Sequence, residues 1–100
     1  MSNTEDIRIE IHDDNTGEII LMVDAQPMGK MEMSIAGDIL TVYHTEVEPA
    51  GQGKGYAGKL LGALVDYARQ HTFNVYPICE YVQAQFTRHP DQYADIWLKK

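Results

Sequence analysis

The sequence predicts one α+β domain in the order β-β-β-β-α-β-α: an antiparallel four-strand meander, a helix, a fifth strand and C-terminal helices. Apolar and polar residues alternate along the first half of the chain, and helical spacing of apolar residues begins only after Pro49. With 44% hydrophobic residues, the 100-residue chain can bury one core, formed by one layer of helices over one sheet. We expect residues 1–100 to form this single domain, with residues 1–6 disordered.

The first four elements are strands joined by short connections. Ile7, Ile9 and Ile11 alternate with polar residues, the period of two that is typical of a half-buried strand. Turn-forming residues fill 13–17 and 36–38. Short connections between consecutive strands imply an antiparallel meander. The strands are expected at residues 7–11, 18–24, 30–35 and 39–47.

A helix is expected at residues 56–68, where apolar residues recur at helical spacing. Gly58 and Gly62 lie inside it, and each glycine costs about 1 kcal/mol relative to alanine in a helix. Because they are four residues apart they share one face. We expect this face to approach the sheet closely.

A last strand and two short helical segments follow. Residues 73–79 are expected to form the fifth strand, with Pro77 inside it. Because proline cannot donate to a strand ladder, the strand should be unpaired on one side near Pro77. Residues 81–88 are expected to form a short helix and residues 91–98 a final turn or two.

The composition excludes several classes of protein. A net charge of −7 argues against general binding of nucleic acid, which needs clustered Lys and Arg. The longest apolar runs, such as residues 19–23, are far shorter than the roughly 20 residues of a membrane span, and residues 1–6 do not resemble a secretory signal. Cys79 is the only cysteine, which favours a reducing compartment, the cytoplasm. We therefore expect no nucleic-acid or membrane partner.

The most informative segment joins the fourth strand to the first helix. Gly51, Gly53 and Gly55 alternate there, in a stretch (49–65) that contains no acidic residue. Glycines at a helix start let backbone N–H groups approach an anion at the positive end of the helix dipole. The alternative is that they only form a tight turn into the helix.

Two well-known phosphate-binding motifs almost match. Gly53, Gly55 and Gly58 have the spacing of the dinucleotide fingerprint, but that fingerprint begins directly after its strand and belongs to a larger parallel sheet. Gly53 and Gly58-Lys59 have the spacing of a P-loop, but Leu60 replaces the Ser or Thr that holds magnesium. Both interpretations fail on their structural context.

A third motif fits its context. Gln52-x-x-Gly55-x-Ala57 follows a strand and opens an amphipathic helix, as does the Gln/Arg-x-x-Gly-x-Gly/Ala motif of the GCN5-related N-acetyltransferases. Residues 44–47, Tyr76-Pro-x-Cys79 and His89-Pro90 add to the match. Over residues 7–97 the chain resembles the smallest, single-domain branch of that superfamily. The resemblance implies a sheet whose fourth and fifth strands splay apart around the pantetheine arm of coenzyme A.

The resemblance also implies a ligand and its binding residues. The cosubstrate is acetyl-coenzyme A, with no metal ion, and the acceptor is an amine-bearing small molecule or peptide. Lys54 would face the phosphates as a point charge. The expected coenzyme A site comprises Val47, Gln52, Gly53, Lys54, Gly55, Tyr56 and Ala57.

Two residues are candidates for the chemistry. His44 could act as general base or acid, because the unperturbed pKa of histidine lies near neutrality. Cys79, near the end of the fifth strand, could donate a proton to the coenzyme thiolate or attack the thioester. We expect the two side chains to lie across the thioester from one another. Larger relatives use a tyrosine on the next helix as the acid, where this chain has Phe86, with Tyr81 about a turn earlier.

Three functions remain open from the sequence: an acetyl-coenzyme A-dependent N-acetyltransferase, a non-catalytic module that binds coenzyme A, and an interaction domain. The helices that usually build the acceptor side are absent, since only the turn 13–17 separates the first two strands. The Gln52-to-Ala57 motif argues against the third function. The sequence leaves the amine acceptor and the oligomeric state open.

Overall fold

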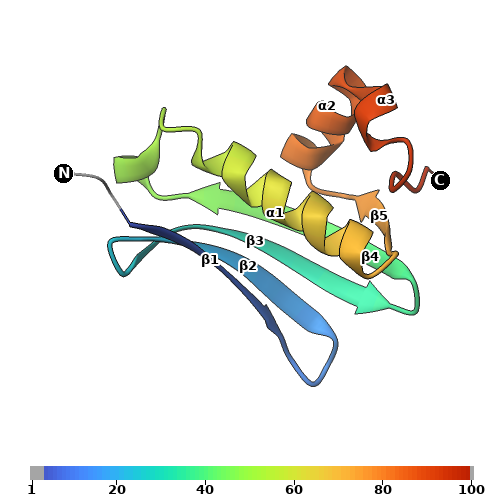
Figure 1. Ribbon diagram of the computed structural model, residues 1–100, viewed down its shortest axis with the longest axis horizontal. Helices are drawn as coiled ribbons and strands as arrows, with labels where there is room; N and C mark the ends of the chain where they lie inside the picture. The colour runs from blue at the N-terminus through green and yellow to red at the C-terminus, as the bar shows by residue number, and fades with distance from the viewer. Residues whose placement is uncertain (1–3, 100) are drawn as a thin grey trace.

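The computed structural model describes residues 4–99 and has the predicted α+β architecture (Figure 1). The expected order of strands and helices is confirmed, with short helical turns before α1 and after α2. The elements are β1 (Glu5–Ile11), β2 (Thr16–Val23), β3 (Gln26–Ala36), β4 (Ile39–Val47), η1 (Pro49–Gly51), α1 (Tyr56–Gln70), β5 (Asn74–Pro77), α2 (Glu80–Arg88) and α3 (Pro90–Tyr93).

Some boundaries differ from the sequence-based expectation. Glu5 and Asp6 belong to β1, so the disorder expected for residues 1–6 does not hold for these two residues, and residues 1–3 lie outside the described part of the chain. β3 begins at Gln26, four residues earlier than expected. Pro27 is accommodated there because the pairing of β2 with β3 is irregular between Leu21 and Met22, opposite this proline.

The five strands form one sheet in the order β1-β2-β3-β4-β5, so the first and last strands are its two edges. The first three pairings are antiparallel, as expected of a meander. β4 and β5 run parallel, because the chain crosses back over the sheet through α1 before β5 begins (Figure 1).

The predicted splay between the fourth and fifth strands is confirmed. Their pairing starts at Ile39 and Asn74 and ends at Val42 and Pro77. β4 continues to Val47, paired with β3 on its other side only. β5 is an edge strand, which agrees with the expectation that it is unpaired on one side near Pro77. Its expected extent, residues 73–79, is wrong, because β5 ends at Pro77.

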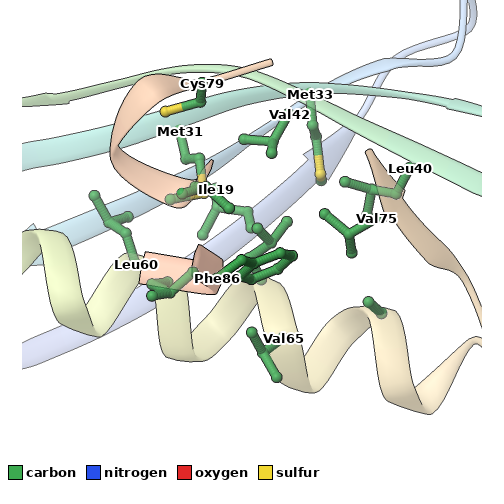
Figure 2. Close-up of a cluster of buried hydrophobic side chains, with 14 of the residues drawn as sticks. Ile19, Met31, Met33, Leu40, Val42, Leu60, Val65, Val75, Cys79 and Phe86 are labelled. Atoms are coloured by element: carbon green, nitrogen blue, oxygen red, sulfur yellow. The ribbon is translucent and has the colours of Figure 1, made fainter. Parts of the chain in front are cut away.

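All helices pack on one face of the sheet. Ile19, Met31, Leu40 and Val42 point toward them and are fully buried, with Phe86 of α2 among them (Figure 2). The opposite face, which we call the bare face, carries a chain of ion pairs. Lys30 Nζ lies 3.3 Å from Glu32 Oε1 and 4.0 Å from Glu18 Oε2.

One expectation about α1 is wrong. Gly58 and Gly62 were expected to bring the helix close to the sheet, but both are exposed. A Cβ atom at Gly62 would meet nothing within 4 Å, and one at Gly58 would meet only the Tyr81 hydroxyl, at 4.0 Å. The buried face of α1 is instead formed by larger residues: Tyr56, Leu60, Leu61, Leu64, Val65 and Ala68.

β4 contains a bulge at Tyr43. Val42 is opposite Met33 and His44 is opposite Glu32, so Tyr43 is an extra residue without a register partner. A bulge shifts side-chain alternation by one. Leu40 and Val42 therefore face the helices before it, and Thr45 faces them after it.

Candidate functional site

The loop between β4 and α1 exposes its backbone at two glycines. Gly53 and Gly55 have φ angles of 79° and 75°, in the left-handed region that favours glycine. A Cβ atom at either position would meet nothing within 4 Å. The backbone of this loop is therefore open to a ligand, and side chains at these positions would occupy that space.

Gly55 is also the N-cap of α1. Among the described residues no side chain caps this helix start, and its first turn holds no acidic residue. The first N–H groups of a helix have no intrahelical acceptor and lie at the positive end of the dipole. The start of α1 can thus accept an anion such as a phosphate.

Local packing holds the loop in place. Gly51 is buried, and a Cβ atom there would lie 2.7 Å from Cδ2 of Tyr56, so only glycine lets this ring close over the η1 turn. The Gln52 side chain donates from Nε2 to the carbonyl oxygen of Val47 at 2.9 Å. The motif glutamine therefore ties the loop back to the end of β4.

Two lysines flank the helix start, and they differ in their contacts. Lys59 forms an ion pair with Glu5 of β1 and lies 5.8 Å from the centroid of the Tyr56 ring. Lys54 is exposed in the loop and, within the described residues, has no carboxylate partner. Lys54 is thus the lysine that remains available to an anion beside the exposed glycines.

Cys79 lies at the point where β4 and β5 separate. The carbonyl oxygen of Val42 accepts from the N–H groups of both Ile78 and Cys79, at 3.0 and 2.9 Å. The Cys79 Sγ atom is 3.2 Å from Oγ1 of Thr45, on the part of β4 that β5 no longer covers. The side chain is only 4% exposed and belongs to the core, on the helix-covered face (Figure 2).

His44 points the other way. It lies opposite Glu32 on the bare face, with 55% of its side chain exposed, and its Nε2 atom is 3.0 Å from Oε1 of Glu46. The structure therefore does not bring His44 and Cys79 together. The backbone of residues 44–46 of β4 lies between them, because His44 points to the bare face and Cys79 packs on the opposite face against Thr45.

The aromatic residues of α2 divide between core and site. Phe86 is fully buried and stacks on Tyr93, with ring centroids 4.5 Å apart, so it belongs to the core. Tyr81 places its hydroxyl beside Gly58, near the start of α1. Burial, and then the neighbouring Tyr93 and Cys79, raise the pKa of Tyr81 above its usual value. Its hydroxyl stays protonated and can donate.

Sequence reasoning missed Thr45. Its partner Cys79 is 34 positions away, and no local pattern connects the two. Nor does the described part of the chain hold a cluster of three or more His, Cys, Asp or Glu side chains arranged as metal ligands. Within the same residues, every helix is too short or too polar to cross a membrane.

The chain belongs to the GCN5-related N-acetyltransferase family, because a model of the GCN5-related N-acetyl-transferase family matches residues 8–96. That match includes the splay, the loop and both catalytic candidates. No curated protein is similar enough in sequence to count as a match.

Solved structures share the fold. A ribosomal-protein-alanine N-acetyltransferase from Brucella melitensis biovar Abortus superposes over 97% of this chain and 93% of its own, with a TM-score of 0.69 and 15% identity. A GCN5-like protein from Staphylococcus aureus matches 100% of this chain and 93% of its own, with a TM-score of 0.65 and 24% identity. For aminoglycoside N-acetyltransferase AAC(6')-Iy, whose structure contains CoA, the TM-score is 0.62 at 11% identity, over 100% of this chain and 91% of its own.

Other similar proteins are longer. The match to the ribosomal-protein-S18-alanine N-acetyltransferase of Escherichia coli covers 59% of this chain but only 38% of that protein, with a TM-score of 0.55 and 19% identity. This chain therefore corresponds to part of such proteins.

Proposed function

We propose that this protein is an N-acetyltransferase that moves the acetyl group of acetyl-coenzyme A to an amine. One observation carries the proposal: an uncapped helix start with two open left-handed glycines lies directly beside the splay of β4 and β5. Pyrophosphate fits the first feature and an extended pantetheine arm fits the second. Family membership and the CoA complex of a protein with the same fold support this assignment.

The proposed coenzyme A site uses the residues expected from the motif. The backbone N–H groups of Gly53, Gly55 and the first turn of α1 would receive the pyrophosphate, and Lys54 would add a positive charge. Gln52 would act indirectly, by holding the loop against Val47. Val47, Tyr56 and Ala57 complete the proposed site.

Acetyl-coenzyme A supplies an activated thioester, so the protein has to assist two proton transfers. As the amine nitrogen bonds to the carbonyl carbon and the carbon–sulfur bond breaks, the amine loses a proton and the thiolate gains one. We propose that His44 accepts the proton that the amine loses. His44 is exposed on the bare face and is oriented by Glu46. This assignment places the acceptor on that face.

Two groups near the splay could protonate the departing thiolate. Cys79 carries a thiol beside Thr45, and Tyr81 carries a hydroxyl beside the start of α1. We favour Cys79, because its side chain contacts the stretch of β4 that borders the proposed pantetheine arm. The burial of Cys79 means that the arm, or a small movement of α2, must open the path to it.

The acceptor class follows from the charge of the bare face. Glu18, Glu32 and Glu46 lie on it with one lysine, Lys30, so it favours a cationic amine, whether small molecule or peptide. Proteins of the same fold include acetyltransferases of aminoglycosides and of ribosomal protein alanine. A reducing compartment, the cytoplasm, suits the single free cysteine.

The test is turnover. Purified protein with acetyl-coenzyme A should release free thiol only when a suitable amine is present, and a panel of polyamines, aminoglycosides and peptides would identify it. A second candidate, a coenzyme A-binding module without turnover, is favoured by the buried Cys79. Coenzyme A binding without thiol release across the whole panel would support that second function. Absence of binding would refute both.

A further inference from the structure

β1 is a free edge of the sheet with an uncovered apolar row. Ile7, Ile9 and Ile11 are 36%, 37% and 43% exposed, although they share a face with the buried Ile19 and Leu21 of β2. Between this row and α1 lies a groove of about 560 Å³, lined on the helix side by Ala63 and Tyr67. The helix layer therefore stops short of β1 (Figure 1).

The edge has one of the usual protections against pairing, charged side chains, and lacks the others. Soluble proteins protect edge strands with charged side chains, lysine above all, and with proline, bulges or very short strands. β1 is seven residues long, contains no proline or lysine, and pairs with β2 in an unbroken register. Its charged residues have both signs, so an edge of this length can accept a strand whose facing charges are complementary.

The backbone of β1 presents four residues to such a strand. The Thr4 carbonyl accepts from Asp24 N–H, and His12 N–H donates to Thr16. Even-numbered residues therefore bond to β2, and by the alternation of an antiparallel ladder the odd-numbered residues point N–H and C=O outward. The outward groups belong to Glu5, Ile7, Ile9 and Ile11, and the last three are the residues whose apolar side chains are uncovered.

The charged side chains of β1 favour one register of pairing with β1 of a second copy. In an antiparallel pair with a two-fold axis at Ile9, Ile7 faces Ile11 of the second copy, and Arg8 faces its Glu10. Asp6 then faces His12. With the axis at Arg8 instead, two arginines would oppose each other and Asp6 would oppose Glu10. Among residues 6–12, only the axis at Ile9 pairs all three isoleucines with one another and places no like charges opposite each other. Glu5 would face Asp13 of the second copy, but Lys59 already forms an ion pair with Glu5.

Glu10 needs such a partner. It lies directly opposite Glu18 in β2, a like-charged pair, and among the described residues it has no ion pair. Within residues 4–99, the ion pair of Arg8 is a 3.7 Å contact with Asp6 on its own strand. A second copy would supply a cation to each Glu10 and an anion to each Arg8.

From these observations we infer that β1 is a self-association edge, on which two copies of the chain pair antiparallel about Ile9 and join their sheets. The six outward backbone groups of Ile7, Ile9 and Ile11 in each copy are satisfied, and the two isoleucine rows meet above the joined strands. The proposed coenzyme A site lies at the opposite edge of the sheet, between β4 and β5, so association leaves it open. The inference does not depend on the proposed function.

The test is sedimentation of the full chain over a range of concentrations. A single strand pair is a small interface, so we expect reversible dimers with a dissociation constant between about 1 μM and 1 mM. Arg8→Glu and Glu10→Arg should each raise this constant at least tenfold, because each converts two attractive pairs into repulsive ones. The double variant should restore dimers, and so should an equimolar mixture of the two single variants, whose facing charges are again opposite.

A backbone test separates association from folding. Ile9→Pro removes an outward N–H but no bond to β2, so the variant should fold and stay monomeric. Hydrogen exchange should show the Ile7, Ile9 and Ile11 amides protected only at high concentration. A chain that stays monomeric at 1 mM, dimers unaffected by either charge reversal, or charge reversals that the double variant does not rescue would each overturn the inference. Unchanged coenzyme A binding in these variants would confirm that the two edges act separately.

Discussion

Thr45 Oγ1 and Cys79 Sγ lie 3.2 Å apart, just beyond the point where β4 and β5 separate. The contact joins the splayed stretch of β4 to the residue that precedes α2. It therefore fixes the position of the thiol at the wall of the proposed pantetheine channel. It also links the first turn of α2 to the strand that carries His44.

The first prediction concerns the two catalytic candidates. His44→Ala and Cys79→Ser should each lower kcat by ten- to a thousandfold, about 1.4–4 kcal/mol of barrier, while coenzyme A affinity changes little. The measurement is thiol release on an identified acceptor, with calorimetry for affinity. Tyr81→Phe is the matched comparison, since it removes only the other candidate donor. If Tyr81→Phe lost activity and Cys79→Ser kept it, the protonation would belong to Tyr81.

The second prediction concerns the loop glycines. Gly55→Val forces a β-branched residue to a φ of 75° and fills the open space above the backbone, so it should weaken coenzyme A binding at least tenfold, about 1.4 kcal/mol. Gly58→Ala, one turn along, needs no such φ and should bind normally. A folded Gly55→Val with unchanged affinity would place the ligand elsewhere. In the parent protein, coenzyme A should raise the Tm, whereas equal ATP or NAD should not.

The third prediction follows from the exposed face of α1. Because Gly62 is helical, exposed and clear of neighbours, Gly62→Ala should raise the free energy of unfolding by about 0.5–1 kcal/mol. Urea denaturation with an unchanged m value would measure this gain. If these glycines instead permitted close packing on the sheet, Gly62→Ala would lower the free energy of unfolding. A destabilised variant would therefore contradict the structure.

The fourth prediction concerns pH. Arg69 of α1 donates from Nε and Nη2 to the two carboxylate oxygens of Asp95, at 3.0 and 3.2 Å. The hydrogen bond from Arg69 holds the pKa of Asp95 below its ordinary value of 3.8. A lowered folded-state pKa gives stability that is present above the ordinary value and is lost as pH falls through the folded value.

Asp95→Asn should therefore lower the Tm at pH 7 but make little difference in strong acid, where the parent carboxylate is also protonated. Thermal melts of both proteins from neutral pH to about pH 2 measure this convergence. A Tm difference that stayed constant over this range would show that the effect of Asn is steric. Asp91→Asn, an exposed change nearby, is the control.

The sequence predicts the elements well but not which way key side chains point. Ile7, Ile9 and Ile11 predict a strand correctly, and Pro77 predicts that the fifth strand has one side without a partner, because alternation and the missing N–H are local properties. The face of the sheet to which His44 points depends on the bulge at Tyr43, and no residue type in the sequence predicts that bulge. Without that bulge, His44 would follow Leu40 and Val42 toward the helices.

The candidate site likewise has features that local sequence predicts and features that depend on tertiary packing. The glycine loop proposed to bind phosphate could be expected because its glycines, the preceding strand and the following helix are contiguous in the chain. The burial of Cys79 and its contact with Thr45 depend on how α2 docks, which is a tertiary property. Likewise, Gly58 and Gly62 share a face as expected, but only the packed structure shows that this face is the exposed one.

The parallel pairing of β4 with β5 has a consequence for the order of assembly. The meander grows from neighbouring strands through short turns, whereas Ile39 and Asn74 can meet only after the loop and α1 have crossed the sheet. Pairings that close long loops form slowly. We expect this seam to form last and to open first in local unfolding. A molecule that contacts both β4 and β5 would then stabilise the last-formed part of the fold. Bound substrate would therefore protect the pairing of β4 with β5 from local unfolding and from proteolysis.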